Sequence, residues 1–487
     1  MESFVGERQV ARMSTKLWTL RMRHASKRGE KSAKTPTAEA WGRRFVILII
    51  LAWAASFVIG FETALTILVL VGFAAAVMGL RSPAIGLLGI GILATLDALT
   101  RVFLLSGGLL RWNTLNYWLV IVILLYVPFI LRLNDPHSRL LQVFLLLLSF
   151  GLLISPSLGN GIQDILNIVA TFALVVYFAR ALEEDQAFYW LGIVNGVLAA
   201  VGGLAFNLQQ TSLTYINPNA LAVFPLTALF SICLGYPRTE GSQTKKLILL
   251  SLAAVNFMWI FLSGSRGNLL IGLCCVLFLL FSTRIFSRNS IFLIIIISLG
   301  FWISLGFVDL QTYTVGRWER LFDTAFTLAE RTSGRSDIAL AGWYLFLENP
   351  LGVGTGGFES SVSSFEILDF EGRPAHSAWI KTLAENGIPG IIFLVAYVAS
   401  FAIVGLEKRN QGLLLVGLLV TVSFGISFLS TEFQGKSLWL LAAGGTVLLH
   451  KKEMIQHIRG GARFRGGRNK FLWRYRRRSR MRCDRSE

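Results

Sequence analysis

Residues 45–59 read FVILIILAWAASFVI and residues 63–80 read TALTILVLVGFAAAVMGL, with no charged side chain in either run. A helix needs about 20 apolar residues to cross the hydrocarbon core of a bilayer. These two runs therefore predict transmembrane helices, with a re-entrant hairpin as the alternative for this short first pair. The whole chain agrees, because 54% of its 487 residues are hydrophobic and only 15% are charged, against about 25% charged in soluble domains. This composition excludes a soluble globular protein.

Fourteen apolar runs of this kind lie between residues 45 and 450, and the fourth covers 115–132. The predicted fold class is all-α, a polytopic integral membrane bundle of about 12–14 transmembrane helices. An even number of crossings places both chain ends on the same side of the membrane. Asn195 and Asn256 fall inside apolar runs and are predicted to form hydrogen bonds between helices.

The net charge of +18 lies in the two ends of the chain. Residues 1–44 carry 11 Lys and Arg against 4 acidic residues, and residues 451–487 carry 14 against 3. Basic segments beside membrane spans stay on the cytoplasmic side, where anionic lipid attracts them. Both tails are therefore predicted to be cytoplasmic. Nucleic acid is the alternative partner for basic tails, but the neighbouring spans favour the membrane surface, so no nucleic-acid partner is predicted.

These patterns divide the chain into five parts, in which long apolar stretches are separated by one long polar connection. They are a basic tail at 1–44, about 11 transmembrane helices at 45–308, a large outer loop at 309–386, about three transmembrane helices at 387–450, and a second basic tail at 451–487.

The connection at 309–386 is the one long loop, and loops of this length are usually functional or disordered. Its tryptophans favour a folded cap that leans on the membrane. The stretch 338–346 predicts a short amphipathic helix that ends at Asn349-Pro350, and Gly352-Val-Gly-Thr-Gly-Gly357 predicts a flexible turn. The glycines do not follow a strand within a βαβ unit, so a nucleotide-binding loop is not predicted.

Several polar residues gather on the outer side in this topology. Arginine forks match phosphate oxygens in pairs and keep their charge, so several arginines suit a diphosphate. A neutral histidine accepts a proton near pH 7. A structural role is the alternative for each residue taken alone. The candidates are Arg266 and Ser265 between two spans, Arg331, Arg335, His376 and Glu385 in the long loop, and Asn217 and Asn219 in another outer turn.

The same residues occur in an order that resembles the superfamily of O-antigen ligases and Wzy-type O-antigen polymerases. The resemblance covers roughly residues 210–430. It rests on the order, spacing and sidedness of six motifs: Asn217-Pro-Asn219, Ser265-Arg266-Gly267, Ser333-Gly-Arg335, Asn349-Pro-Leu-Gly-Val-Gly-Thr-Gly-Gly357, Ala375-His376-Ser377 and Glu385-Asn-Gly-Ile-Pro-Gly390. Two departures are Ser377, where the family often has asparagine, and fourteen predicted spans instead of twelve.

The resemblance implies a metal-independent glycosyltransferase with no cofactor, embedded in the bacterial inner membrane. Its large loop is periplasmic, and a glycan moves from an undecaprenyl-diphosphate-linked donor to an acceptor hydroxyl. The acceptor is lipid A core for a ligase and a second lipid-linked glycan for a polymerase. By resemblance, His376, Arg266 and Arg335 are catalytic. Substrate-binding candidates are Arg331, Asn217, Asn219, Ser265 and Glu385.

Several alternatives stay open at this stage. Ligase and polymerase share all of these motifs, a chain-length regulator is a candidate partner, and a protein acceptor is a minor possibility. The rival class is a transporter or lipid-linked glycan flippase, in which the arginines bind an anionic cargo without chemistry. That class predicts a polar path through the membrane, whereas the polar candidates cluster on one surface.

Overall fold

The computed structural model describes residues 37–103, 122, 130, 133, 135–184, 186–209, 218–239, 242–283, 287–304, 335–362, 375, 377–408, 410–427 and 436–455. Every regular element in these ranges is a helix, which confirms the all-α fold class. The bounds are α2 (Ala38–Ile59), α3 (Phe61–Met78), α4 (Pro83–Phe103), α6 (Pro136–Leu153), α7 (Leu158–Ala181), α8 (Ala187–Gln209), α9 (Pro218–Gly235), the 3₁₀ turn η2 (Tyr236–Arg238), α10 (Gln243–Leu262), α11 (Arg266–Thr283), α12 (Arg288–Ser304), α15 (Arg335–Glu348), α16 (Phe358–Val362), α17 (Ala378–Glu407), α18 (Gln411–Ile426) and α19 (Lys436–Leu449).

Nine of the described helices are long and apolar enough to cross a membrane, and four shorter apolar helices accompany them. Each of the thirteen coincides with a predicted span, while the predicted span at 115–132 lies outside the described residues, apart from Val122 and Ile130. Helices are expected in a membrane, because lipid offers no hydrogen-bond partners to the backbone and a helix pairs its own N–H and C=O groups. α17 begins at Ala378, earlier than the predicted start at 387, and Gly387 forms a kink inside it.

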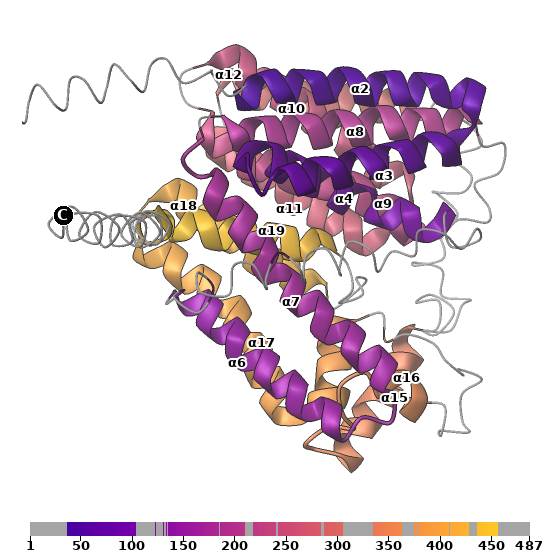
Figure 1. Ribbon diagram of the computed structural model, residues 1–487, viewed down its shortest axis with the longest axis vertical. Helices are drawn as coiled ribbons and strands as arrows, with labels where there is room; N and C mark the ends of the chain where they lie inside the picture. The colour runs from indigo at the N-terminus through magenta and orange to yellow at the C-terminus, as the bar shows by residue number, and fades with distance from the viewer. Residues whose placement is uncertain are drawn as a thin grey trace, which may run out of the picture.

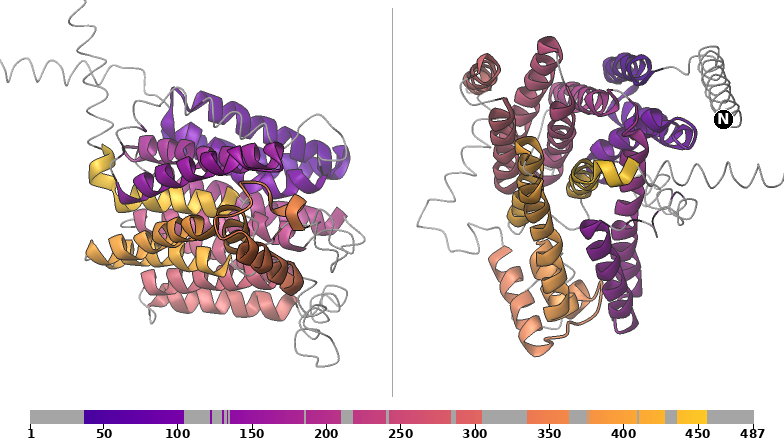
Figure 2. Two further views of the ribbon diagram at one scale, coloured as in Figure 1. Left: turned by 90° about the horizontal axis from the view of Figure 1, so that it is seen from below. Right: turned by 90° about the vertical axis from the view of Figure 1, so that its left-hand side faces the viewer.

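The helices form two groups that share α18 and α19 (Figure 1). The larger group contains α2, α3, α4, α8, α9, α10 and α11, whose neighbours pack along much of their length. In the other group, α6 packs against both α7 and α17, and these helices are tilted relative to the larger group. The short helices α15 and α16 pack on α17 and form a cap at its beginning. Figure 2 shows the tilted helices and this cap on one side of the larger group.

Polar side chains link the helices of the larger group. Asn195 of α8 donates from Nδ2 to Ser231 Oγ of α9 at 2.8 Å. Asn256 of α10 donates from Nδ2 to the Gly196 carbonyl of α8 at 3.1 Å. Both predicted interhelical hydrogen bonds are confirmed, and they fix neighbouring helices where packing alone has little directional preference.

Connections between helices alternate between two ends of the bundle. The site end comprises residues 154–157, 263–265 and 349–357. The far end comprises the connections at 79–82, 182–186, 236–242 and 408–410. One hydrogen bond links two of these regions. Glu184 Oε1, in the connection 182–186, accepts from the backbone amide of Ala84 at the start of α4 at 3.0 Å. Each crossing therefore runs between the same two ends, as a membrane bundle requires.

Candidate active site at the site end of the bundle

A cluster of amides and a hydroxyl lies where α9 and α11 begin. Ser265 Oγ donates to Asn219 Oδ1 at 2.7 Å, and Asn268 Nδ2 donates to Ser265 Oγ at 2.9 Å. Asn268 also donates to the Asn219 carbonyl at 3.4 Å. Ser265 and Asn268 are buried, so these bonds replace the water that the groups lose. The predicted residues Asn219 and Ser265 are thus brought together, although they are 46 positions apart in sequence.

Arg266 is the first residue of α11, directly after Ser265. Gly264 precedes this start with a φ of +70°, a left-handed conformation that turns the chain from α10 into α11. The first amides of a helix are unpaired and carry partial positive charge. Arg266 is partly exposed, so its guanidinium and the start of α11 together form an electropositive site.

Arg335, another predicted catalytic residue, lies at the start of the described part of a helix. It is the first described residue of α15 and is partly exposed. Ser377 accepts from the Ile380 amide at 3.3 Å and so caps α17 immediately after His376, which gives the serine at this position a structural role. Arg266 belongs to the larger helix group and Arg335 to the cap. His376, Arg331 and Asn217 themselves lie outside the described residues.

The glycine-rich turn at 352–357 binds the backbone of the kink in α17. The amide of Val353 donates to the Ala384 carbonyl at 3.0 Å, and that of Gly354 donates to the Glu385 carbonyl at 2.9 Å. In an unbroken helix the Glu385 carbonyl would accept from residue 389, which is proline and has no N–H. The turn therefore supplies the donor that the proline removes. Two of the predicted motifs form one unit for this reason.

Four positions in this unit require glycine because their φ is positive and a Cβ would meet backbone, and Gly354 and Gly387 are two of them. Gly354 has a φ of +98°, and a Cβ there would lie 2.7 Å from Ser155 of the α6–α7 turn. Gly387 has a φ of +58°, and a Cβ there would lie 2.1 Å from the Pro350 carbonyl oxygen. The turn is therefore pressed between the α6–α7 turn and α17. The predicted turn is present at 352–357, and backbone hydrogen bonds tie it to α6 and α17.

Thr355 fixes the turn from its other side. Its amide donates to the Gly151 carbonyl at 3.2 Å, and its hydroxyl oxygen lies 2.9 Å from the Leu148 carbonyl of α6. The same oxygen lies 3.0 Å from Asn386 Oδ1 of α17. One threonine therefore connects α6, the turn and α17.

Three charged side chains lie buried beneath the turn. Lys381 Nζ is 2.7 Å from Asp164 Oδ2 of α7 and 3.8 Å from Glu385 Oε1. Glu385 Oε1 also accepts from the Phe358 amide, where α16 begins, at 3.1 Å. Glu385 is buried, and these contacts are with the chain itself. This charge cluster, Asp164–Lys381–Glu385, ties α7 and α17 to the cap.

The predicted short helix within 338–346 is confirmed by α15, which ends before Asn349 as expected, but its predicted amphipathic character is wrong because both of its faces are apolar. Its inner face packs Ile338, Ala341 and Leu345 against Phe358 and Ile380. Its outer face is also apolar and about half exposed. The outer residues are Leu340, Trp343, Tyr344 and Leu347, spaced along one side of the helix. Aromatic residues on such a face are typical of the membrane–water interface.

The roles of two members of this region could not be predicted from the sequence. Asn268 belongs to the polar connection 263–268 between two predicted spans, and its hydrogen bond to Asn219 forms only when α9 and α11 are packed together. Asp164 lies 217 positions before Lys381. An acidic residue inside an apolar run is a signal that a buried partner exists, and that signal was present at Asp164. Its partner could not be named without the packing of α7.

Residues 249–395 match the family model described as O-antigen ligase. This segment is similar to O-antigen ligases. It extends from α10 into α17 and contains Ser265, Arg266, Arg335 and Glu385, while Asn219 lies before it. No curated protein matches the chain. The resemblance drawn from the motifs is thereby confirmed over this segment.

The match to O-antigen ligases and the apolar helices together support a coarse statement of function. The protein is a multi-pass membrane protein with a glycosyltransferase-like domain for glycan processing of the ligase or polymerase type. Such a domain implies a lipid-linked glycan donor and an acceptor. The predicted site residues that the structure describes lie at the site end of the bundle, and several of them fall in this domain.

Proposed function

We propose that the protein transfers a glycan from an undecaprenyl-diphosphate-linked donor to an acceptor hydroxyl at the periplasmic face of the bacterial inner membrane. One observation carries the proposal. Within the segment that matches the O-antigen ligase model, Arg266 begins α11, where unpaired amides favour an anion, and Arg335 lies at the start of the described part of α15. Guanidinium groups at helix starts are suited to a diphosphate, which presents several oxygens in fixed geometry.

In the proposed reaction, Arg266 and Arg335 bind the diphosphate of the donor. The acceptor oxygen attacks the anomeric carbon and forms the new glycosidic bond, while the bond from that carbon to the phosphate oxygen breaks. His376 accepts the proton of the acceptor hydroxyl. The electron pair leaves with undecaprenyl diphosphate, whose negative charge the two arginines stabilise. A single displacement of this kind inverts the configuration at the anomeric carbon. No nucleotide sugar and no metal ion enters the step.

The remaining candidates support this step by holding the donor and the helix starts. Asn219 and Ser265 fix the first turn of α11, so they orient Arg266 as well as offering polar groups to the glycan. Glu385 holds the cap through the Phe358 amide and thereby sets the position of α15, which contains Arg335. Asn217 and Arg331 are the further substrate-binding residues in this proposal.

In this proposal the reaction takes place at the membrane surface, next to the bilayer that holds the lipid-linked donor. The outer apolar face of α15, with Trp343 and Tyr344, suits contact with the lipid surface at the periplasmic interface. The basic tails at 1–44 and 451–487 would then lie in the cytoplasm, at the far end of the bundle. The donor's polyprenyl chain would remain in the bilayer while its diphosphate reaches the site end.

The test is release of undecaprenyl diphosphate by the purified protein in EDTA, from a donor that carries a short oligosaccharide. One sample also contains lipid A core, and the other contains only the donor. Release that requires lipid A core identifies a ligase, and release with a lengthened product from donor alone identifies a polymerase. A chain-length regulator added to the second sample would alter product length but not release.

His376→Ala and Arg335→Ala should each abolish release, whereas Arg81→Ala at the far end should leave it intact. Absence of release in both samples, from protein shown to be folded, would contradict the proposal and favour a transporter of lipid-linked glycans.

A further inference from the structure

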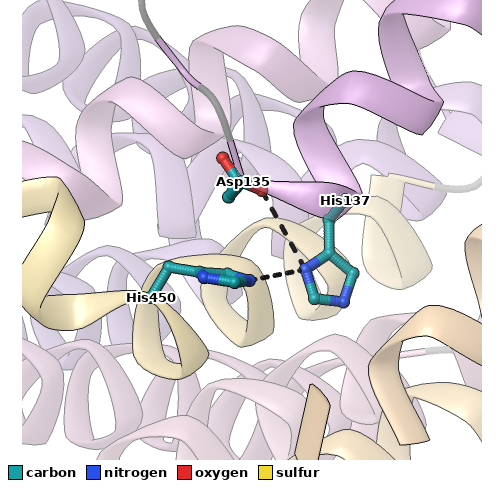
Figure 3. A group of neighbouring side chains, drawn as sticks. All are labelled: Asp135, His137 and His450. Atoms are coloured by element: carbon teal, nitrogen blue, oxygen red, sulfur yellow. Dashed lines mark hydrogen bonds and ion pairs between the residues drawn. The ribbon is translucent and has the colours of Figure 1, made fainter. Parts of the chain in front are cut away.

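A second polar cluster lies at the far end of the bundle, away from the proposed active site. It consists of Asp135 before α6, His137 in the first turn of α6, and His450 directly after α19 (Figure 3). His137 Nδ1 lies 3.0 Å from His450 Nε2 and 3.9 Å from Asp135 Oδ1. One possible ligand atom from each residue lies within 4.8 Å of the other two.

All three side chains are withdrawn from solvent, since Asp135, His137 and His450 are 8%, 1% and 5% exposed. Asp135 Oδ2 and His137 Nε2 are buried without a hydrogen-bond partner. A buried carboxylate oxygen without a partner is costly unless a cation compensates its charge. The two facing ring nitrogens also repel one another unless a proton or a metal ion lies between them.

The donor set and its spacing fit a divalent transition metal. Two imidazole nitrogens and one carboxylate oxygen are ligands that zinc prefers, whereas calcium and magnesium prefer oxygen alone. Ligand atoms about 2.0–2.1 Å from a tetrahedral zinc ion are roughly 3.4 Å apart. The distances of 3.0 Å and 3.9 Å lie on either side of that value, so small rotations of the side chains would bring the three ligand atoms to the spacing of a tetrahedral site with its fourth position open.

The surroundings hold the ligands in place. Asp135 Oδ1 accepts from the Ser138 amide at 2.9 Å and so caps α6, which fixes its carboxylate at the start of the helix. The His137 ring packs on Phe401 with centroids 3.9 Å apart, and the backbone carbonyl of Ser400 faces the imidazole.

Partly exposed charged side chains lie near the cluster. Lys408 and Glu453, which follows His450 by three residues, form an ion pair at 3.6 Å and are 31% and 50% exposed. The cluster therefore lies close to the exposed surface of the far end.

We propose that Asp135, His137 and His450 form a zinc site that fastens the beginning of α6 to the end of α19. The residues join segments 313 positions apart in sequence. Because α6 also holds Thr355 of the glycine-rich turn, the site fixes the far end of a helix that positions the active-site cap. The role is structural. It does not depend on the proposed glycan transfer, because the cluster and the active site lie at opposite ends.

The experiment measures zinc in the purified full-length chain after treatment with a chelator, dialysis against Zn²⁺ and gel filtration. We expect one zinc ion per chain, and a thermal unfolding temperature that rises with zinc and falls again with chelator. His450→Ala and His137→Gln each remove one of three ligands, which should weaken binding by about 100-fold or more. His457→Ala, in the basic tail, is the matched control and should retain both properties.

Equal zinc content in the wild type, His450→Ala and His137→Gln would show that the metal binds elsewhere and would overturn the proposal. So would a wild-type chain that holds no zinc and whose unfolding temperature does not respond to zinc or chelator. If His450→Ala fails to fold, His450→Gln keeps a polar side chain of similar reach, and the wild-type response to chelator decides the question on its own. Either result leaves the release assay for glycan transfer unaffected.

Discussion

Lys381→Met tests the importance of the buried charge cluster for the site end. The lysine is the cation shared by Asp164 at 2.7 Å and Glu385 at 3.8 Å, and the three side chains are 14%, 5% and 3% exposed. Methionine keeps the length and apolar stem of the side chain, so the change removes the charge with little loss of packing. Two buried carboxylates then remain without their cation.

Removing one partner of a buried ion pair costs about 3–5 kcal/mol. A loss of this size lowers the ratio of folded to unfolded protein by roughly 10²- to 10⁴-fold, since about 1.4 kcal/mol corresponds to a factor of ten. The assay is denaturant unfolding in mixed micelles, followed by tryptophan fluorescence. Adding Asp164→Asn should recover part of the loss, because one of the two uncompensated charges is then gone.

Lys408→Met is the matched control, since its ion pair with Glu453 spans 3.6 Å and is largely exposed. Exposed pairs contribute about 0.2–1 kcal/mol, so this variant should remain close to the wild type. If Lys381→Met were no less stable than Lys408→Met, the cluster would not hold the cap, and the argument from its burial would be refuted.

Three further variants address the turn, the amide cluster and the far end. Gly354→Ala should lower the free energy of unfolding by at least about 1–2 kcal/mol, because alanine is strained in a left-handed backbone, and it should reduce glycan transfer. Gly159→Ala is the control, since a Cβ there would meet no atom within 4 Å, and equal unfolding curves for the two variants would contradict the prediction. Asn268→Ala should cost about 1–3 kcal/mol because Ser265 loses a buried partner, and a change below the error of the unfolding assay would count against the cluster. Burial raises the pKa of Glu184 above its ordinary 4.5, so the free energy of unfolding should fall as pH rises from 4.5 through the raised pKa. Glu184→Gln should abolish this decline, and a decline that persists in the variant would show that Glu184 is not its source.

Hydropathy predicted the fold well because lipid imposes a simple rule on sequence. Each crossing must be a helix of sufficient apolar length, and α2 and α3 show that rule directly. The predicted span at 387–406 covers only the later part of α17, which begins at Ala378 and carries Lys381 and Glu385 in its first turns. The neutralisation of these two charges could not be worked out from the sequence, because α7 contributes Asp164 to it.

The candidate site could be predicted as a set of motifs but not as an arrangement. Proline at 389 and the glycines at 352–357 are each ordinary turn signals, whereas their complementary hydrogen bonds depend on the tertiary fold. The cluster of Asp135, His137 and His450 had no sequence signal of any kind, because its two histidines are 313 positions apart and follow no metal-binding spacing.

The central claim is that Arg266 and Arg335 hold the diphosphate of the donor while the glycan is transferred. Single-turnover release of undecaprenyl diphosphate by Arg266→Lys tests it most directly, with Arg81→Lys at the far end as control. Lysine keeps the charge but loses the paired hydrogen bonds, so release should slow by at least about tenfold in Arg266→Lys and stay unchanged in the control. Wild-type release by Arg266→Lys would contradict the claim.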